Sequence, residues 1–171
     1  MFRMALIVTA LTVSTAQADL AVRFIEGAPK DQFRIMNLSE CPTGPIKVTI
    51  DLAGSAAGLI FDTTAAGAGV EVFQPLQLAD GSEYVRELPT IIDGDTAMTL
   101  SLLSIPGDGT VSVTVDVDDT MAQSVLGQIR VAGSEIFGAE VTLRAENYDG
   151  ITMPFSTRGR MTLPTAGCTN S

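Results

Sequence analysis

The sequence predicts an all-β fold, an antiparallel two-sheet β-sandwich of about 8–10 strands. Apolar and polar residues alternate in short segments that recur about every ten residues, separated by Gly, Pro, Asp and Asn. In the segment KVTIDL, Val48, Ile50 and Leu52 point to one side of a strand and the polar residues to the other, as in a sheet with one buried face. Helical periodicity is hard to find after residue 18. A closed β-barrel is the alternative, because strand number does not separate the two architectures.

The alternating segments predict the strands one by one. In chain order we expect strands at Ala21–Ile25, Gln32–Asn37, Ile46–Leu52, Gly58–Thr63, Gly69–Gln74, Ala97–Ser104, Thr110–Asp118, Gly127–Val131 and Ala139–Ala145, and a last one at Thr152–Phe155 or Arg160–Leu163. The segments AGSAAG (53–58) and AAGAG (65–69) lie between strands. We interpret them as loops in which glycine supplies unusual backbone angles.

The N-terminus has the pattern of a secretory signal peptide, predicted to span residues 1–18. Arg3 precedes an apolar run from Met4 to Val13, and Ala16-Gln17-Ala18 supplies the small residues that signal peptidase requires. Neither a twin arginine nor a cysteine at the cleavage point is present, and no second apolar stretch of about 18 residues follows. We therefore expect a secreted or periplasmic protein without membrane insertion, whose residues 19–171 form a single β-sandwich domain.

The chain is strongly acidic, with a net charge of −10. All 20 acidic residues follow Ala18, whereas Arg3 is lost with the predicted signal peptide, so the expected mature charge is near −11. Such a surface repels nucleic acids and anionic membranes. We expect no nucleic-acid partner, and an unidentified protein or glycan partner at the cell surface.

Only two cysteines occur, Cys41 and Cys168, and both remain after cleavage. Export brings them into a compartment that permits disulfides, so we expect them to pair. Two unpaired thiols are the alternative, because nothing in the sequence shows that the two approach each other.

A β-hairpin is predicted from TAMTLSLLSI and TVSVTVDVDD around the turn Pro106-Gly107-Asp108-Gly109. With the turn centred between Gly107 and Asp108, Met98 faces Val117 and Leu100 faces Val115. Apolar residues then meet apolar residues at every pair, and a slip by one residue would misplace them all.

This register places five carboxylates at one end of the hairpin, namely Asp93, Asp95, Asp116, Asp118 and Asp119. Like charges so close together repel each other, so water, raised pKa values or a hard cation should offset them. Calcium fits the last possibility because it binds six to eight oxygen ligands from carboxylates, carbonyls and water. We therefore predict a calcium site at these five aspartates, with a solvated acidic strand end as the alternative.

Several kinds of catalytic site are excluded by residues that the chain lacks. It contains no histidine, so imidazole metal ligands and Ser–His or Cys–His nucleophile pairs cannot form. No G-x-S-x-G, phosphate-binding or dinucleotide-binding motif is present. We expect a protein that is not an enzyme, with a carboxylate-based hydrolase as the minority hypothesis.

Four segments together carry a family resemblance: DLAVRFIEGAPKDQF, TIDLAGSAAGLIFDTTAAGAGVEVFQP, VDVDDT and VAGSEIFGAEVTLRAE. They resemble exported bacterial proteins labelled aggregation factor core proteins, after a sponge cell-adhesion proteoglycan. The resemblance implies calcium-dependent adhesion or matrix assembly, and we carry that onto Asp116, Asp118 and Asp119. The expected function is thus an exported, calcium-stabilised binding or structural module. A metal-free periplasmic structural component is the alternative, beside the hydrolase.

Overall fold

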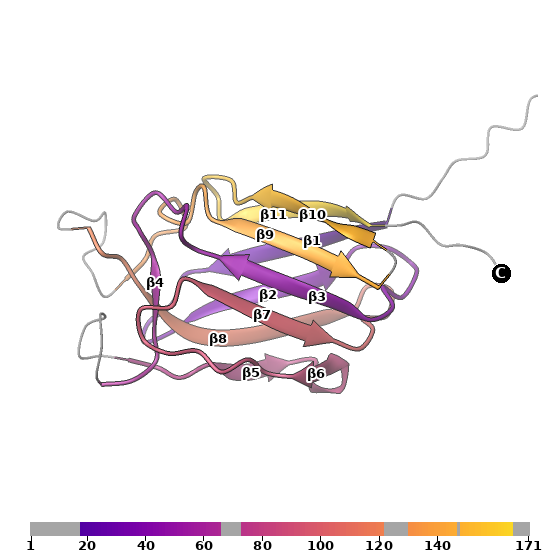
Figure 1. The fold of residues 1–171 in the computed structure, drawn as a ribbon, viewed down its shortest axis with the longest axis horizontal. Coiled ribbons are helices and arrows are strands. Elements are labelled where there is room, and N and C mark those ends of the chain that lie inside the picture. Colours follow the sequence, from indigo (N-terminus) through magenta and orange to yellow (C-terminus); the bar gives the residue numbers. More distant parts are fainter. Residues whose placement is uncertain (1–17, 66–72, 122–129, 147, 166–171) are drawn as a thin grey trace, which may run out of the picture.

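Two antiparallel β-sheets pack face to face in the computed structural model, which describes residues 18–65, 73–121, 130–146 and 148–165 (Figure 1). The predicted β-sandwich is confirmed, because neither sheet closes into the barrel that was the alternative. No helix in the described part of the chain is long and apolar enough to cross a membrane.

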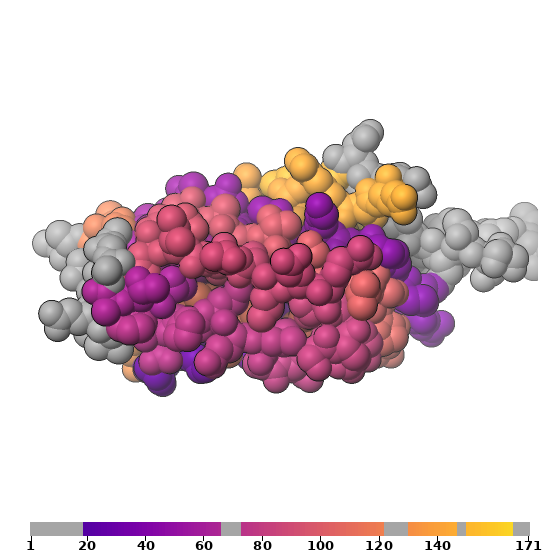
Figure 2. Space-filling view, turned by 60° about the horizontal axis from the view of Figure 1, so that its bottom comes forward, coloured from indigo at the N-terminus to yellow at the C-terminus, as the bar shows by residue number. Residues whose placement is uncertain are grey.

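Sheet A and sheet B are formed by strands that come from the whole length of the chain. Sheet A has the order β11 (Arg160–Thr165), β1 (Ala18–Ile25), β2 (Asp31–Asn37), β8 (Thr110–Asp118) and β4 (Ile60–Asp62), and β5 (Gln77–Asp80) also pairs with β8. Sheet B has the order β10 (Tyr148–Pro154), β9 (Glu140–Ala145), β3 (Ile46–Asp51), β7 (Ala97–Leu102) and β6 (Val85–Glu87). A short 3-10 helix, η1 (Ser82–Tyr84), joins β5 to β6, and this segment covers one long side of the sandwich (Figure 2).

Most of the predicted strands are present, and both alternatives for the last one exist, as β10 and β11. The sequence did not predict β5 and β6, which are short and largely exposed and therefore lack an apolar alternation. Two predicted strands lie largely outside the described residues: positions 69–72 of Gly69–Gln74 and positions 127–129 of Gly127–Val131. The described remainders of these two segments are not strand.

The core lies between the two sheets and follows the predicted alternation. Along β2, the residues facing sheet B are buried and those between them are partly exposed. Phe33 of β2 packs against Phe24 of β1 with ring centroids 5.2 Å apart, and against Phe61 of β4 at 6.3 Å. Burying each aromatic side chain contributes roughly 2–3 kcal/mol, so Phe61 anchors β4, a strand of only three residues.

The predicted β7–β8 hairpin is wrong, because the two strands belong to different sheets. Met98 faces Ile50 of β3 and not Val117, while Val117 faces Phe61 of β4. The connection from β7 to β8 crosses from sheet B to sheet A. Both strands turn their apolar residues toward the core in either arrangement, so matching apolar positions cannot distinguish a hairpin from a crossing between sheets.

Asn37 holds two such crossing connections together, the one from β2 to β3 and the one from β7 to β8. Its buried side-chain Nδ2 lies 2.6 Å from the carbonyl oxygen of Cys41, 3.1 Å from that of Ile105 and 3.0 Å from that of Pro106. Its Oδ1 accepts a hydrogen bond from the backbone N–H of Ser39 at 3.1 Å. One amide thus links the two connections, in addition to the bonds that these carbonyls accept from Ser39, Thr43 and Gly109.

Two sequence predictions concern residues that the structure does not describe. The predicted signal peptide falls on residues 1–17 apart from Ala18, where β1 begins. Cys168 also lies outside the described residues, so the Cys41–Cys168 disulfide stays a prediction.

The loop that leads from β3 into β4 packs closely against the loop that precedes β9. Ala56 donates its N–H to the carbonyl of Phe137 at 2.8 Å. Gly138 has a φ of +89°, and a methyl group there would lie 2.5 Å from the carbonyl oxygen of Gly54. The reverse contact, from a methyl group on Gly54 to the carbonyl of Gly138, would measure 2.6 Å. Glycine at both positions is therefore what allows the two loops to touch.

We expect Gly138→Ala to lower the free energy of unfolding by about 1–3 kcal/mol, since alanine disfavours this φ and its methyl group would displace the Gly54 backbone. Gly133→Ala is the matched control, because nothing lies within 4 Å of a methyl group there. The control should stay within about 0.5 kcal/mol of the parent protein in urea unfolding. Equal unfolding free energies for the two variants would contradict the close approach of the loops.

Candidate metal site

Three aspartates from two neighbouring strands form a compact buried cluster. Asp62, Asp116 and Asp118 each offer one carboxylate oxygen, and these oxygens lie within 4.8 Å of one another. The three side chains are 0%, 3% and 1% exposed, respectively. Asp62, Asp116 and Asp118, called the aspartate cluster below, are the only group of potential metal ligands found among the described residues.

The pairing of β4 with β8 brings these side chains together. Asp62 stands directly opposite Asp116, and Ile60 opposite Asp118. Phe61 and Val117 form the pair between them and are both fully buried in the core. Since side chains alternate along a strand, the aspartates lie on the other face of the two strands, on one side of a short ladder.

Gln74 ties the cluster to the chain before β5 through its backbone. Its N–H donates to the carbonyl of Asp62 at 3.4 Å, and its carbonyl accepts the N–H of Asp116 at 3.2 Å. Backbone atoms of Gln74 therefore connect the two strands that carry the aspartates.

Two further buried carboxylates lie close to the cluster. Asp31, at the start of β2, is 2% exposed and accepts a hydrogen bond from the N–H of Gly27 at 2.9 Å. Asp119 is 4% exposed, and its Oδ1 accepts the N–H of Met121 at 3.1 Å. The predicted ligand Asp119 is thus buried next to the cluster in sequence, although the group of mutually close oxygens does not include it.

The structure gives Asp93 and Asp95 a different role from the one predicted, and they are not part of the aspartate cluster. The backbone of Phe61 bonds to this loop: its N–H donates to the carbonyl of Asp95 at 2.9 Å and its carbonyl accepts the N–H of Gly94 at 3.0 Å. Strand β4 therefore lies between the loop and β8. The predicted hairpin would have placed the loop of Asp93 and Asp95 directly beside the end of β8. In the structure β4 lies between them.

The Asp93 carboxylate caps a turn. Its Oδ1 accepts the N–H groups of Thr63 and Thr64, both at 2.7 Å, and its Oδ2 accepts the Thr64 hydroxyl at 3.0 Å. Partial burial raises the pKa of Asp93, but these hydrogen bonds outweigh it and hold the pKa below its ordinary value. Asp95 accepts the N–H of Ile92 at 2.9 Å, which also fixes the turn.

Burial of the acidic groups has a clear electrostatic consequence. Burial raises the pKa of Asp116 to about 7, and the charges of Asp118 and Asp62 add to the rise against a hydrogen bond from the Val117 backbone. Burial also raises the pKa of Asp31 to about 7; hydrogen bonds from Gly27 and Val117 oppose the rise and the charges of Asp116 and Asp118 reinforce it. These carboxyls therefore hold protons at a pH where ordinary aspartates are ionised.

Ionising the whole cluster would be costly without a counter-charge. Two unit charges 4.8 Å apart repel by about 3.5 kcal/mol at an effective dielectric constant near 20. Protons on some carboxyls remove part of this repulsion, and a cation among the oxygens would remove more. Calcium binds oxygen at about 2.3–2.6 Å, so two of its ligands lie at most about 5 Å apart, a span compatible with the cluster.

Of the five predicted ligands, Asp116 and Asp118 belong to the aspartate cluster, whereas Asp62 and the nearby Asp31 were not predicted. Asp62 follows the continuous apolar run Leu59-Ile60-Phe61 and lies within the predicted strand Gly58–Thr63, so its place near the end of a buried strand was visible in the sequence. The partner of that strand was not visible, because the pairing of β4 with β8 joins segments more than 50 residues apart.

Comparisons with protein-family models, with curated proteins and with solved structures found no match. The functional argument therefore depends on the geometry of this chain.

In metal-free buffer containing EDTA, we expect the protein to be more stable at pH 5 than at pH 8. The folded-state pKa values of Asp31 and Asp116, about 7, lie above the unfolded value of 3.8, so the folded state binds more protons between these values. Stability is then lost as the pH rises through this window, by roughly 2–3 kcal/mol for one such carboxyl. Urea unfolding at a series of pH values measures the effect.

Asp116→Asn should make this pH profile shallower, because the amide does not titrate and Asp31 keeps a raised pKa. Asp108→Asn is the matched control: it removes the same charge from an exposed turn residue whose φ of 58° asparagine tolerates. A parent protein with equal stability at pH 5 and pH 8 would contradict the assignment.

Proposed function

We propose that this chain is an exported, non-enzymatic binding or structural module that binds calcium at the aspartate cluster and acts in cell-surface adhesion or matrix assembly. The observation that carries the proposal is the cluster itself: three buried carboxylates on two paired strands, with oxygens within 4.8 Å of one another. A hard divalent cation is the ligand that such a group of oxygens favours.

Calcium bound here would stiffen one end of the sandwich. Its ligands come from β4 and β8, so the ion would join a strand of three residues to a strand of nine. Because these ligand positions exist only when the two strands pair, calcium binds the folded state in preference to the unfolded state and raises stability.

Burial of the cluster also supports a role other than catalysis. Side chains that are 0–3% exposed cannot touch a substrate, so a carboxylate-based hydrolase would need other acids. The chain contains no histidine to act as a base in their place. The partner of the module is then a protein or glycan at the cell surface, and the location is secreted or periplasmic as the N-terminal pattern predicts.

The second candidate is a periplasmic structural component without metal. The raised pKa values of Asp31 and Asp116 favour it, because protons alone then reduce the charge of the site near neutral pH. The two candidates differ in what happens at higher pH, where protons leave the cluster and calcium binds more strongly.

At pH 8 we expect calcium at about 10 mM to raise the melting temperature by about 3–10 °C over EDTA, given the millimolar or tighter affinity of extracellular calcium sites. Asp62→Asn and Asp118→Asn should remove the calcium-dependent rise, whatever they do to the melting temperature in EDTA. Asp108→Asn should keep it. A parent protein that melts equally in calcium, magnesium and EDTA would favour the metal-free candidate.

Export is tested on the protein recovered from its native host. We expect it in the periplasmic or culture-medium fraction with an N-terminus at Asp19, and its unreduced digest should contain a peptide pair linked through Cys41 and Cys168. An intact N-terminus at Met1 in the cytoplasmic fraction would overturn the proposed location. Loss of calcium-dependent cell aggregation in a deletion strain would support the adhesion role, and unchanged aggregation would oppose it.

A further inference from the structure

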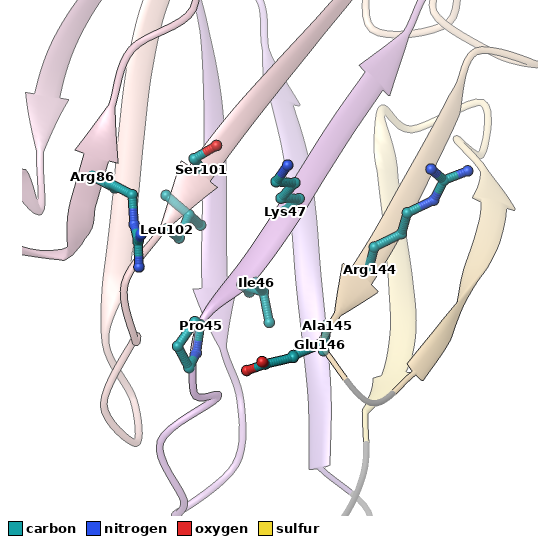
Figure 3. Close-up of a pocket in the computed structure, with 9 residues that line it drawn as sticks. All are labelled: Pro45, Ile46, Lys47, Arg86, Ser101, Leu102, Arg144, Ala145 and Glu146. Atoms are coloured by element: carbon teal, nitrogen blue, oxygen red, sulfur yellow. The ribbon is translucent and has the colours of Figure 1, made fainter.

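A groove of about 490 Å³ lies on the outer face of sheet B, at the end where β3 begins and β7 and β9 end. Its charged lining consists of Lys47, Arg86, Arg144 and Glu146. Figure 3 shows Arg86, Lys47 and Arg144 spread across the sheet, with Lys47 between the other two. The groove therefore gathers three cations and one anion in a chain whose net charge is −10.

The basic side chains stand in positions where they repel each other. Lys47 of β3 lies directly opposite Arg144 of β9, and like charges in opposed positions destabilise a sheet. None of the three cations forms an ion pair or hydrogen bond within the described part of the chain. An anionic ligand would offset this repulsion.

A row of hydroxyl groups runs beside the basic row on the same face. Two residues further along β3, Thr49 stands opposite Thr142 of β9 and Thr99 of β7, and Thr142 stands opposite Thr152 of β10. The hydroxyls of Thr49 and Thr99 are 2.8 Å apart and those of Thr142 and Thr152 are 2.7 Å apart. Each hydroxyl can make more hydrogen bonds than the one it has, so the row can still bind a polar ligand.

We propose that this groove binds an acidic oligosaccharide. Carboxylate or sulfate groups of the sugar chain pair with Lys47, Arg86 and Arg144, and sugar hydroxyls bind the threonine row and Ser101. The inference depends on the proposed binding role and names its partner class, but it uses none of the aspartates.

The surroundings of the groove favour a sugar chain over an acidic peptide. Strand β3, which carries Lys47 between the two arginines, pairs with β7 on one side and β9 on the other, so a peptide cannot extend the sheet along β3. The residues that line the groove include no aromatic ring, so recognition depends on charge and hydroxyl groups. A neutral sugar would leave the cations unpaired.

The groove and the aspartate cluster lie at opposite ends of the sandwich. Strand β3 runs from Ile46, at the groove, to Asp51, near the loop that enters β4 (Figure 1). Substitutions at one site can therefore be made without touching the other.

The test measures binding of the purified parent protein to a galacturonic acid hexasaccharide, a sulfated hexasaccharide, a neutral galactose hexasaccharide and an oligoglutamate peptide, by calorimetry in EDTA. We expect at least one acidic sugar to bind, and to bind at least about tenfold more tightly than the neutral sugar and the peptide. The double variant Lys47→Gln/Arg144→Gln should lose at least about tenfold in affinity. Lys47→Arg, which keeps the charge, should bind nearly as the parent does.

Two controls separate a built site from general charge and from the calcium proposal. Arg23→Gln removes a cation from the outer face of sheet A and should leave binding unchanged, whereas Thr142→Val should weaken binding of the sugar. Equal binding of the peptide, equal binding of the neutral sugar, absence of binding to either acidic sugar, or unchanged binding by the double variant would each overturn the inference. The calcium-dependent melting shift of the double variant should match that of the parent, so failure of one proposal is distinguishable from failure of the other.

Discussion

The buried side-chain amide of Asn37 connects the two chain segments that cross between the sheets, and the arrangement of the strands depends on these crossings. It bonds to carbonyls in both connections that cross between the sheets: the one after β2 leads to β3 in sheet B, and the one after β7 leads to β8 in sheet A. Because β8 thereby enters sheet A beside β2, its far end is left to pair with β4. The contact between Asp62 and Asp116 is a result of this crossing, and a hairpin of β7 with β8 would not produce it.

Period-two alternation was sufficient to predict the fold class and most strands, because burial of one face repeats at every second residue. It was insufficient for strand pairing: Met98 faces a valine in the hairpin and an isoleucine in the structure, and both choices bury it. Asp116 and Asp118 were predicted because they end a strong strand. Asp62 was missed because its partner strand is distant in sequence. The turn-capping role of Asp93 was missed because only the fold brings its carboxylate to the N–H groups of Thr63 and Thr64.

Protons and cations are alternative solutions to the same electrostatic problem in this molecule. The core requires Phe61 and Val117 to point inward, and the alternation then forces the neighbouring aspartates together on the other face of the strands. Their repulsion must be reduced by protonation or by a bound positive charge. The pH of the surroundings therefore acts on one small part of the fold, where the pKa values of Asp31 and Asp116 are raised.

The shortness of β4 has a consequence for the resistance of the protein to proteolysis. Only three residues of β4 pair with β8, and the other bonds of the strand go to the loop at Gly94 and Asp95 and to Gln74, so its separation from β8 costs less than unfolding the sandwich. Brief local openings of this kind expose backbone to proteases, and they begin where the pairing is shortest. The rate of proteolysis would then depend on how often this one short strand leaves β8, and not on the stability of the whole sandwich.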